Sequence, residues 1–263
     1  MSAADGLRKG LGQTERPFAL PIEQFIAAKT EAPPPLIGTA DDCILSAYGL
    51  LLYVAKGGKG KTTSTLDAIL HLASGVPWLN FEVPRPLRVL FIENEGPREP
   101  FRRKLERRLA HWPHPLPEGA IHVYSEDWGQ AGLDDAGFID RLNRYVADHG
   151  IDLVVGDPLD TLGMEGVGSP KDTREMVARL QEAGLFTRTA WWILHHARKG
   201  KAEDAIDEAS GSWGGKPDAL LGLERLPDGR ARLAFHKLRW GRSDLHRRTG
   251  RMEEPRICES RLR

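Results

Sequence analysis

The sequence is poor in cysteine, carries no excess charge of either sign and has no long apolar run. Its two cysteines, Cys43 and Cys258, are too few and too far apart for a disulfide scaffold or a zinc site, and they fit a reducing compartment. Basic and acidic residues number 37 each, so only a local patch could indicate nucleic-acid binding. The polar residues 1–12 lack the apolar core of a signal peptide, and no apolar run approaches the ~20 residues of a membrane span. We therefore expect a soluble, cytoplasmic protein with no membrane partner.

Apolar segments and helical segments alternate through most of the chain. Apolar residues make up 40% of the sequence and charged residues 28%, which is typical of globular domains. The alternation predicts an α/β fold with a mainly parallel sheet and helices on both faces. The expected strands cover residues 50–54, 86–92, 121–124, 153–155, 191–194, 220–226 and 232–238, and the expected helices cover residues 62–74, 98–111, 137–149 and 172–183. The turn Pro-Asp-Gly at 227–229 predicts that the last two strands form a C-terminal β-hairpin.

The beginning of the chain differs from this alternating core. Residues 21–29 have helical spacing, with Ile22, Phe25 and Ile26 on one stripe. Three prolines at 33–35 cannot continue that helix, so we expect a proline-rich linker after it. The helix could pack on its own domain or on a neighbouring subunit, and the sequence leaves both open. We expect three parts: an N-terminal arm over residues 1–43, a core domain over 44–242 and a basic tail over 243–263.

A loop rich in glycine and lysine joins one expected strand to the helix that follows it. Residues 55–63 read Ala-Lys-Gly-Gly-Lys-Gly-Lys-Thr-Thr, and this context predicts a phosphate-binding loop. Glycines allow backbone N–H groups to converge on phosphate oxygens, and the helix N-terminus adds its dipole. We expect Lys61 to reach the β and γ phosphates of ATP and Thr62 to ligate Mg²⁺, although Ala55 stands where the usual pattern has glycine. The expected nucleotide-binding residues are Lys56, Gly57, Gly58, Lys59, Gly60, Lys61, Thr62 and Thr63.

Carboxylates follow two of the expected strands. Asp157 comes after an apolar strand, in the position of the aspartate that holds Mg²⁺ together with the loop hydroxyl, here Thr62. Glu93 and Glu95 follow another strand, where a carboxylate can activate the attacking water. Strand alternation turns both glutamates the same way, so periodicity does not choose between them. We favour Glu95 because it meets a Gly-Pro turn at the carboxyl end of the strand, where ligands of such sheets bind.

Six short motifs follow one another in order between residues 44 and 242. They are Gly-Gly-Lys-Gly-Lys-Thr-Thr (57–63), Val-Leu-Phe-Ile-Glu-Asn-Glu-Gly (89–96), Leu-Val-Val-Gly-Asp (153–157), Ile-Leu-His-His-Ala-Arg-Lys (193–199), Gly-Ser (211–212) before Asp218, and Lys-Leu-Arg-Trp-Gly (237–241). In this order and spacing the chain resembles the RecA-like hexameric motor ATPases, specifically the RepA-type replicative helicases of plasmids and phages and their AAA-named relatives. The resemblance implies a RecA-like P-loop NTPase core with the ATP site at the subunit interface.

The resemblance also implies roles for individual residues. Glu95 would be the catalytic base, and His196, which closes the strand after Asp157, would sense the γ-phosphate. Lys237 and Arg239 would reach into the active site of the neighbouring subunit as trans-acting fingers. Such a finger stabilises the charge that develops in the transition state and can be worth ~10³-fold or more in rate.

The resemblance further implies the partners of the protein. The long loop over residues 198–216 would line a central pore, with Lys199 and Lys201 near a nucleic-acid backbone. We therefore expect a homo-oligomer, with a hexamer as the expected form, that acts on DNA in its single-stranded form. Other replication proteins are further expected partners, and ATP and Mg²⁺ are the expected cofactors.

Two other functions remain open from the sequence. A RecA-like ATPase that binds single-stranded DNA for recombination would share the same core without helicase activity. The loop also matches the phosphate loop of ParA- and MinD-like partition ATPases, in which Lys56 would reach across a dimer. Three features count against a partition ATPase. The loop lies about fifty residues into the chain, the strand after the loop helix lacks the Asp-x-Asp usual in that group, and the His-His and Lys-x-Arg elements are foreign to it.

Overall fold

The computed structural model of the chain describes residues 19–28, 32–127, 129–163, 175–180, 188–196, 216–225 and 231–239. The chain divides into two compact units, Met1–Ala32 and Pro33–Arg263. In the first unit, helix α2 covers Ile22–Ala27, inside the range that the helical spacing predicts. None of its residues is buried, and the apolar stripe of Ile22, Phe25 and Ile26 is exposed. Packing of this stripe on its own domain or on a neighbouring subunit stays a prediction.

The second unit is built on a seven-stranded sheet with the strand order β5-β4-β6-β7-β3-β8-β9. Neighbouring strands pair in parallel from β5 to β8, and β9 pairs antiparallel with β8. The strands are β3 (Leu50–Ala55), β4 (Val89–Glu93), β5 (Ile121–Val123), β6 (Leu153–Asp157), β7 (Ala190–His196), β8 (Ala219–Arg225) and β9 (Ala231–Leu238). The expected α/β fold with a mainly parallel sheet and a C-terminal hairpin is therefore confirmed.

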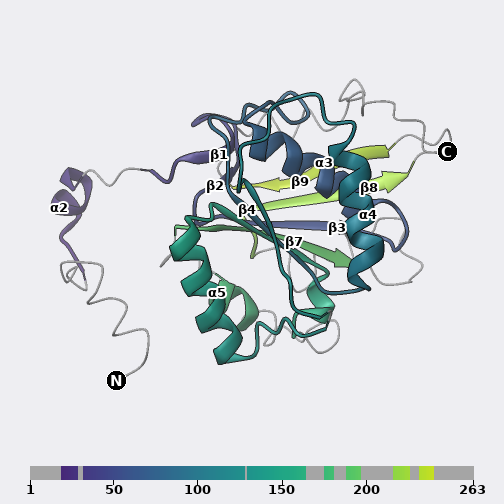
Figure 1. Cartoon of the computed structure of the whole chain (residues 1–263). Helices are drawn as coiled ribbons and strands as arrows, with labels where there is room; N and C mark the ends of the chain where they lie inside the picture. Colours follow the sequence, from purple (N-terminus) through teal and green to yellow (C-terminus); the bar gives the residue numbers. More distant parts are fainter. Residues whose placement is uncertain are drawn as a thin grey trace. The chain divides into compact units, whose positions relative to one another are not determined.

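The sheet is buried on both faces, and each face has its own hydrophobic cluster. In β3, Leu51, Tyr53 and Ala55 belong to one cluster and Leu50, Leu52 and Val54 to the other, as strand alternation requires. Helices α3 (Lys61–Ser74) and α4 (Arg98–Leu109) cover the first face, and α5 (Ala136–His149) and the helical residues 175–180 cover the second (Figure 1). This two-sided burial explains why the strands read as continuous apolar runs. Across the described ranges, no helix has both the length and the apolar character that crossing a membrane requires.

A short antiparallel hairpin precedes β3 and forms part of the second unit. It consists of β1 (Pro35–Gly38) and β2 (Cys43–Ser46). Its apolar residues lie in the same cluster as α3, and they are Leu36, Ile37, Ile44 and Leu45. The three prolines predict a linker, so the sequence places most of this hairpin in the arm. Pro35 instead opens a strand of a two-stranded sheet, a position that tolerates the missing N–H of proline.

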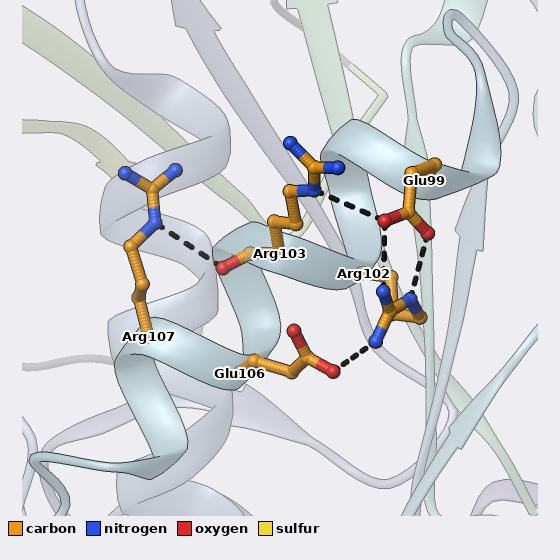
Figure 2. A network of polar contacts seen from close by, with 5 residues as sticks. All are labelled: Glu99, Arg102, Arg103, Glu106 and Arg107. Carbon is orange, nitrogen blue, oxygen red and sulfur yellow. Dashed lines mark hydrogen bonds and ion pairs between the residues drawn. The ribbon is translucent and has the colours of Figure 1, made fainter.

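Helix α4 carries most of its charge on its exposed face. Phe101 is its buried residue, and it stacks on Phe91 of β4. Figure 2 shows Glu99 paired with Arg102 and Arg103, and Glu106 paired with Arg102. Because these side chains are at least half exposed, their ion pairs contribute little to stability. They do offset part of the positive charge of this helix.

Candidate nucleotide-binding site

The loop between β3 and α3 has the backbone of a phosphate cradle. Gly58 and Gly60 have φ angles of 71° and 97°, which favour glycine, and Gly60 caps the N-terminus of α3. A Cβ atom built on Gly57 or Gly58 would meet nothing within 4 Å, so this backbone faces open space. Open glycine backbone ahead of a helix N-terminus fits a phosphate group, since the helix dipole and free N–H groups both favour an anion.

Lys61 points from the first turn of α3 toward the carboxyl ends of the central strands. Its Nζ atom donates to the backbone oxygen of Ala55, 2.8 Å away, and lies 3.0 Å from Nδ1 of His196. The residue is only 5% exposed. Burial lowers the pKa of Lys61, while neighbouring carboxylates, with Asp157 the strongest of them, raise it. A buried ammonium whose contacts are a backbone oxygen and an imidazole nitrogen is poised to exchange them for phosphate oxygens.

The other expected residues of the loop lie around this lysine in different degrees of exposure. Lys56 and Thr63 are half-buried, and Lys59 is exposed. No contact of these three side chains singles out a role, so their part in nucleotide binding stays a prediction.

Thr62 and Asp157 meet directly. The hydroxyl of Thr62 donates to Oδ2 of Asp157 over 2.7 Å, and Asp157 is the last residue of β6. Burial raises the pKa of Asp157 to about 6, although the hydrogen bond from Thr62 lowers it. A hydroxyl and a carboxylate are the hard oxygen ligands that Mg²⁺ prefers, so this pair fits the ion. The described part of the chain holds no cluster of three or more histidine, cysteine, aspartate or glutamate residues suited to a metal, and Mg²⁺ in phosphate sites needs few protein ligands.

Glu93 and Glu95 differ in their surroundings, contrary to the strand alternation expected from the sequence. The strand β4 ends at Glu93, so alternation does not extend to Glu95. Glu93 is buried, and its Oε1 accepts a hydrogen bond from the N–H of Gly96 at 3.0 Å. Burial raises the pKa of Glu93. The Glu95 side chain is 58% exposed and turns toward the site, with Oε2 3.7 Å from Nε2 of His196.

The two histidines at the end of β7 also differ from each other. His196 lies between Lys61 and Glu95, since its two ring nitrogens face these two side chains. The order β6-β7-β3 explains this placement, because Ala55 and His196 are register partners at the shared carboxyl edge. His195 is buried, and burial lowers its pKa to about 4, so that it is neutral at pH 7.

The two expected finger residues lie near the amino end of β3, whereas the phosphate loop follows its carboxyl end. Arg239 follows β9, its N–H bonds the backbone oxygen of Asp218, and its Nη1 lies 3.2 Å from Oδ1 of Asp218. Asp218 in turn accepts the N–H of Leu50 at the amino end of β3. Lys237 pairs in register with Leu220 of β8, near the same edge. The structure therefore does not bring Lys237 and Arg239 to the phosphate loop of their own chain.

The other expected nucleic-acid contacts cannot be placed in the same way. Lys199, Lys201 and the loop that carries them lie outside the described residues, as does the tail over 243–263.

Three residues near the site were not singled out from the sequence. Ser64 Oγ lies 2.8 Å from the hydroxyl of Tyr53 in β3 and 2.9 Å from the backbone oxygen of Lys61, so the pair braces the first turn of α3. Asp160 is exposed and follows Asp157 by one turn. Burial lowers the pKa values of Lys61 and His195, and the charge of Asp160 opposes part of this lowering in both. Two of the three carry a signal in the sequence, since Tyr53 is a tyrosine inside an apolar strand and Asp160 is a second aspartate after Asp157.

Comparison with known proteins agrees with this geometry. No curated protein sequence matches the chain significantly. A solved ATPase domain of another protein has a similar structure, with a TM-score of 0.53 over 73% of this chain and 78% of that chain, at 13% sequence identity. At this identity the likeness shows the fold, which is that of a RecA-like P-loop NTPase. The model of the AAA domain family matches residues 14–202. Because this family model matches more than half of the chain and is consistent with the fold and the phosphate loop, the chain belongs to the AAA domain family of ATPases.

Proposed function

We propose that this protein is an ATP-hydrolysing motor that assembles into a ring, with a hexamer as the expected form, and moves along single-stranded DNA as replicative helicases do. The observation that carries the proposal is the meeting of Lys61, the Thr62–Asp157 pair and the Glu95–His196 pair at one edge of the sheet. These are the parts that phosphoryl transfer to water requires: a phosphate cation, a metal-binding oxygen pair and a carboxylate that is free to orient water.

Each part has a separate task in this proposal. The loop backbone and Lys61 hold the β and γ phosphates, and Thr62 and Asp157 hold Mg²⁺. When bound, the ion would offset negative charge on the phosphate oxygens. Glu95 orients and deprotonates the attacking water, because its carboxylate is exposed toward the site, whereas Glu93 is buried against Gly96 and Arg98. His196 contacts both the phosphate lysine and Glu95, so it can report loss of the γ-phosphate to the loop that follows β7.

The position of Arg239 supports an oligomer. The register between β3, β8 and β9 puts Arg239 beside Leu50, whereas the phosphate loop begins after Ala55 at the other end of β3. The two ends of this strand are separated by roughly 17 Å at the usual rise per residue. A finger at this edge cannot serve its own site, so its partner is the site of an adjacent subunit in a head-to-tail ring. We assign Lys237 to the same edge and the same task.

The DNA part of the proposal rests on the sequence resemblance. Lys199 and Lys201, in the loop after His196, are the proposed contacts to the backbone of the strand. Because this loop follows a residue that contacts the ATP site, hydrolysis could change its position and move the strand.

Three measurements test the function as a whole. Light scattering gives the oligomeric mass with and without a non-hydrolysable ATP analogue, the ATPase rate is measured with and without single-stranded DNA, and a strand-displacement assay measures unwinding. A ring of about six subunits with DNA-stimulated turnover and strand displacement is the result expected of a heterologous ring. Filaments without unwinding would favour the recombination ATPase instead. A nucleotide-dependent dimer would favour the partition ATPase and make Lys56 the residue to mutate.

A pair of matched variants tests the assignment of the base. Glu95→Gln should retain binding of ATP and lose all but a small residual rate of turnover. Glu93→Gln changes a neighbouring carboxylate whose pKa is raised by burial, and it should leave turnover within a few-fold of wild type, since it retains an acceptor for the N–H of Gly96. Unimpaired turnover in Glu95→Gln would move the base to another residue.

A further inference from the structure

Asn94 stands between the two glutamates and has a completely satisfied, buried amide. The residue is 0% exposed. Its Nδ2 donates to the backbone oxygens of Thr161 at 2.6 Å and Ala131 at 3.1 Å. Its Oδ1 accepts the N–H groups of Gly129 at 2.7 Å and Ala131 at 3.3 Å. The side chain therefore uses both donors and both lone pairs that an amide has.

These bonds tie together three segments that are distant in sequence. They are the turn after β4, the segment at 129–131 after β5, and the 3₁₀ helix η1 (Leu159–Thr161), which follows Asp157. The backbone N–H of Asn94 adds a fourth link, since it bonds the backbone oxygen of Asp157 at 2.9 Å. All partners are backbone atoms, so the contacts constrain the path of the chain at each segment.

Glu95 depends on this arrangement for its position. It lies beyond the end of β4, and its side chain makes a polar contact with His196 at 3.7 Å. The residue before it is held by the amide network, and the residue after it, Gly96, is held by Glu93. The base is thus an exposed side chain on a backbone that is fixed from both sides.

We propose that Asn94 is a positioning residue of the hydrolytic site, whose amide sets the place of Glu95 relative to Asp157. The inference rests on the proposed function, because it takes Glu95 as the base and Asp157 as the metal-binding carboxylate. An amide is required, since aspartate has the same shape but cannot donate to the two carbonyl oxygens and would bury a charge beside them. Misplacement of a catalytic group by about 1 Å can cost on the order of 10²-fold in rate.

The test compares Asn94→Asp with wild type in the full chain. We expect kcat for ATP to fall on the order of 10²-fold. Binding of a non-hydrolysable ATP analogue should change by no more than about threefold, because the amide of Asn94 bonds residues outside the phosphate loop. The second arm repeats the substitution in the Glu95→Gln background. If Asn94 acts through Glu95, the residual rate there should fall by no more than about twofold, since effects of residues that act as one unit are not additive.

A control separates positioning from loss of stability. Thr189 is 1% exposed and bonds the backbone oxygen of Ile151 at the amino edge of the sheet, so Thr189→Val removes a buried hydrogen bond far from the site. This variant should lower the unfolding midpoint and leave kcat unchanged. If Asn94→Asp does not fold, Asn94→Ser, which replaces the amide with a single hydroxyl in a smaller volume, takes its place in both arms.

The outcomes distinguish this inference from the function on which it rests. Wild-type turnover in Glu95→Gln would overturn the base and this inference together. A Glu95→Gln variant reduced to a residual rate, together with a wild-type kcat in Asn94→Asp, would overturn the inference alone. Equal losses from Asn94→Asp in the wild-type and Glu95→Gln backgrounds, or parallel losses of kcat and analogue affinity, would also overturn it.

Discussion

Nδ1 of His196 lies 3.0 Å from Nζ of Lys61, and Nε2 of the same ring lies 3.7 Å from Oε2 of Glu95. An ammonium can only donate, so Nδ1 is the acceptor and the proton of a neutral imidazole belongs on Nε2, toward Glu95. The tautomer is thus assigned from the hydrogen-bond network. The histidine connects the lysine that would meet the γ-phosphate with the carboxylate that would activate water.

This connection predicts that His196→Ala lowers kcat more than it weakens nucleotide binding. We expect kcat to fall by roughly 10- to 100-fold, since removing one polar partner of a reacting group has effects of this size. The matched control is His122→Ala on the edge strand β5, away from the site, which should leave kcat unchanged. Steady-state ATPase kinetics together with analogue binding measure both quantities. An unchanged kcat in His196→Ala would mean that Glu95 works without the histidine.

The location of Arg239 predicts that ATPase activity returns when two inactive variants are mixed. Arg239→Ala subunits retain an intact phosphate loop, and Lys61→Ala subunits retain an intact finger. In a head-to-tail ring mixed in equal amounts, about a quarter of the interfaces combine a good site with a good finger, so ATPase activity should recover to about that fraction. The activity of the mixture is measured against each variant alone.

A second mixture is the control for this experiment. Lys61→Ala and Glu95→Gln both damage the site of the subunit that carries them, so mixing them leaves every site inactive. Recovery of ATPase activity in this control would show that mixing restores activity by a route other than a finger. An Arg239→Ala and Lys61→Ala mixture that stays inactive would count against a trans-acting finger.

Asp218 predicts a stability effect at the same edge of the sheet. It is 8% exposed, and its Oδ2 accepts the N–H of Leu50 at 2.9 Å across 168 positions of sequence. Asp218→Ala leaves this N–H without its acceptor, which should lower the free energy of unfolding by ~1–3 kcal/mol. Asp218→Asn retains an acceptor oxygen and should lose less. Urea unfolding measures both variants.

The control for Asp218 is a pair at the surface. Arg85 pairs with Asp152 through both of its terminal nitrogens, but its side chain is 55% exposed. Arg85→Ala should therefore cost no more than ~1 kcal/mol. A larger loss from Arg85→Ala than from Asp218→Ala would contradict the importance given to burial.

The elements of the fold could be predicted because their sequence patterns are local. Strands such as Leu50–Ala55 are buried on both faces, so they read as apolar runs whatever lies beside them. The order of the strands in the sheet depends on packing between distant segments, and no local pattern carries it. Strand β1 (Pro35–Gly38) is not predicted for a related reason, because prolines that predict a linker are also tolerated at the start of an edge strand.

In the candidate site, too, some residues follow local sequence patterns and others depend on distant contacts. The phosphate loop and Asp157 belong to motifs in which residue type and spacing follow from the chemistry, so sequence analysis could name them. Glu93 and Glu95 could not be separated, because strand alternation gives no information beyond the last paired residue of β4. The position of Asn94 depends on hydrogen bonds to residues 35 to 67 positions away, and a lone asparagine in the sequence gives no sign of them.

Cys43 in β2 is 5% exposed, so its thiol is shielded from reagents in the folded protein. Burial, followed by the charge of Asp218, raises the pKa of this thiol from its ordinary 9.0 to about 11. Because only the thiolate reacts, iodoacetamide should modify Cys43 slowly in the folded protein at pH 8–9 and much faster in urea. The rate is measured in Cys258→Ser, so that Cys43 is the thiol observed.

The raised pKa of Cys43 also sets the sign of an effect of pH on stability. Its stabilising contribution is fully present below about pH 9 and is lost as the pH rises toward 11, because the unfolded chain releases the proton first. The urea midpoint should therefore decline more steeply from pH 8 to pH 10 in Cys258→Ser than in Cys43→Ala with Cys258→Ser. Equal slopes in the two proteins, or rapid modification of the folded protein at pH 8, would show that Cys43 is accessible to water.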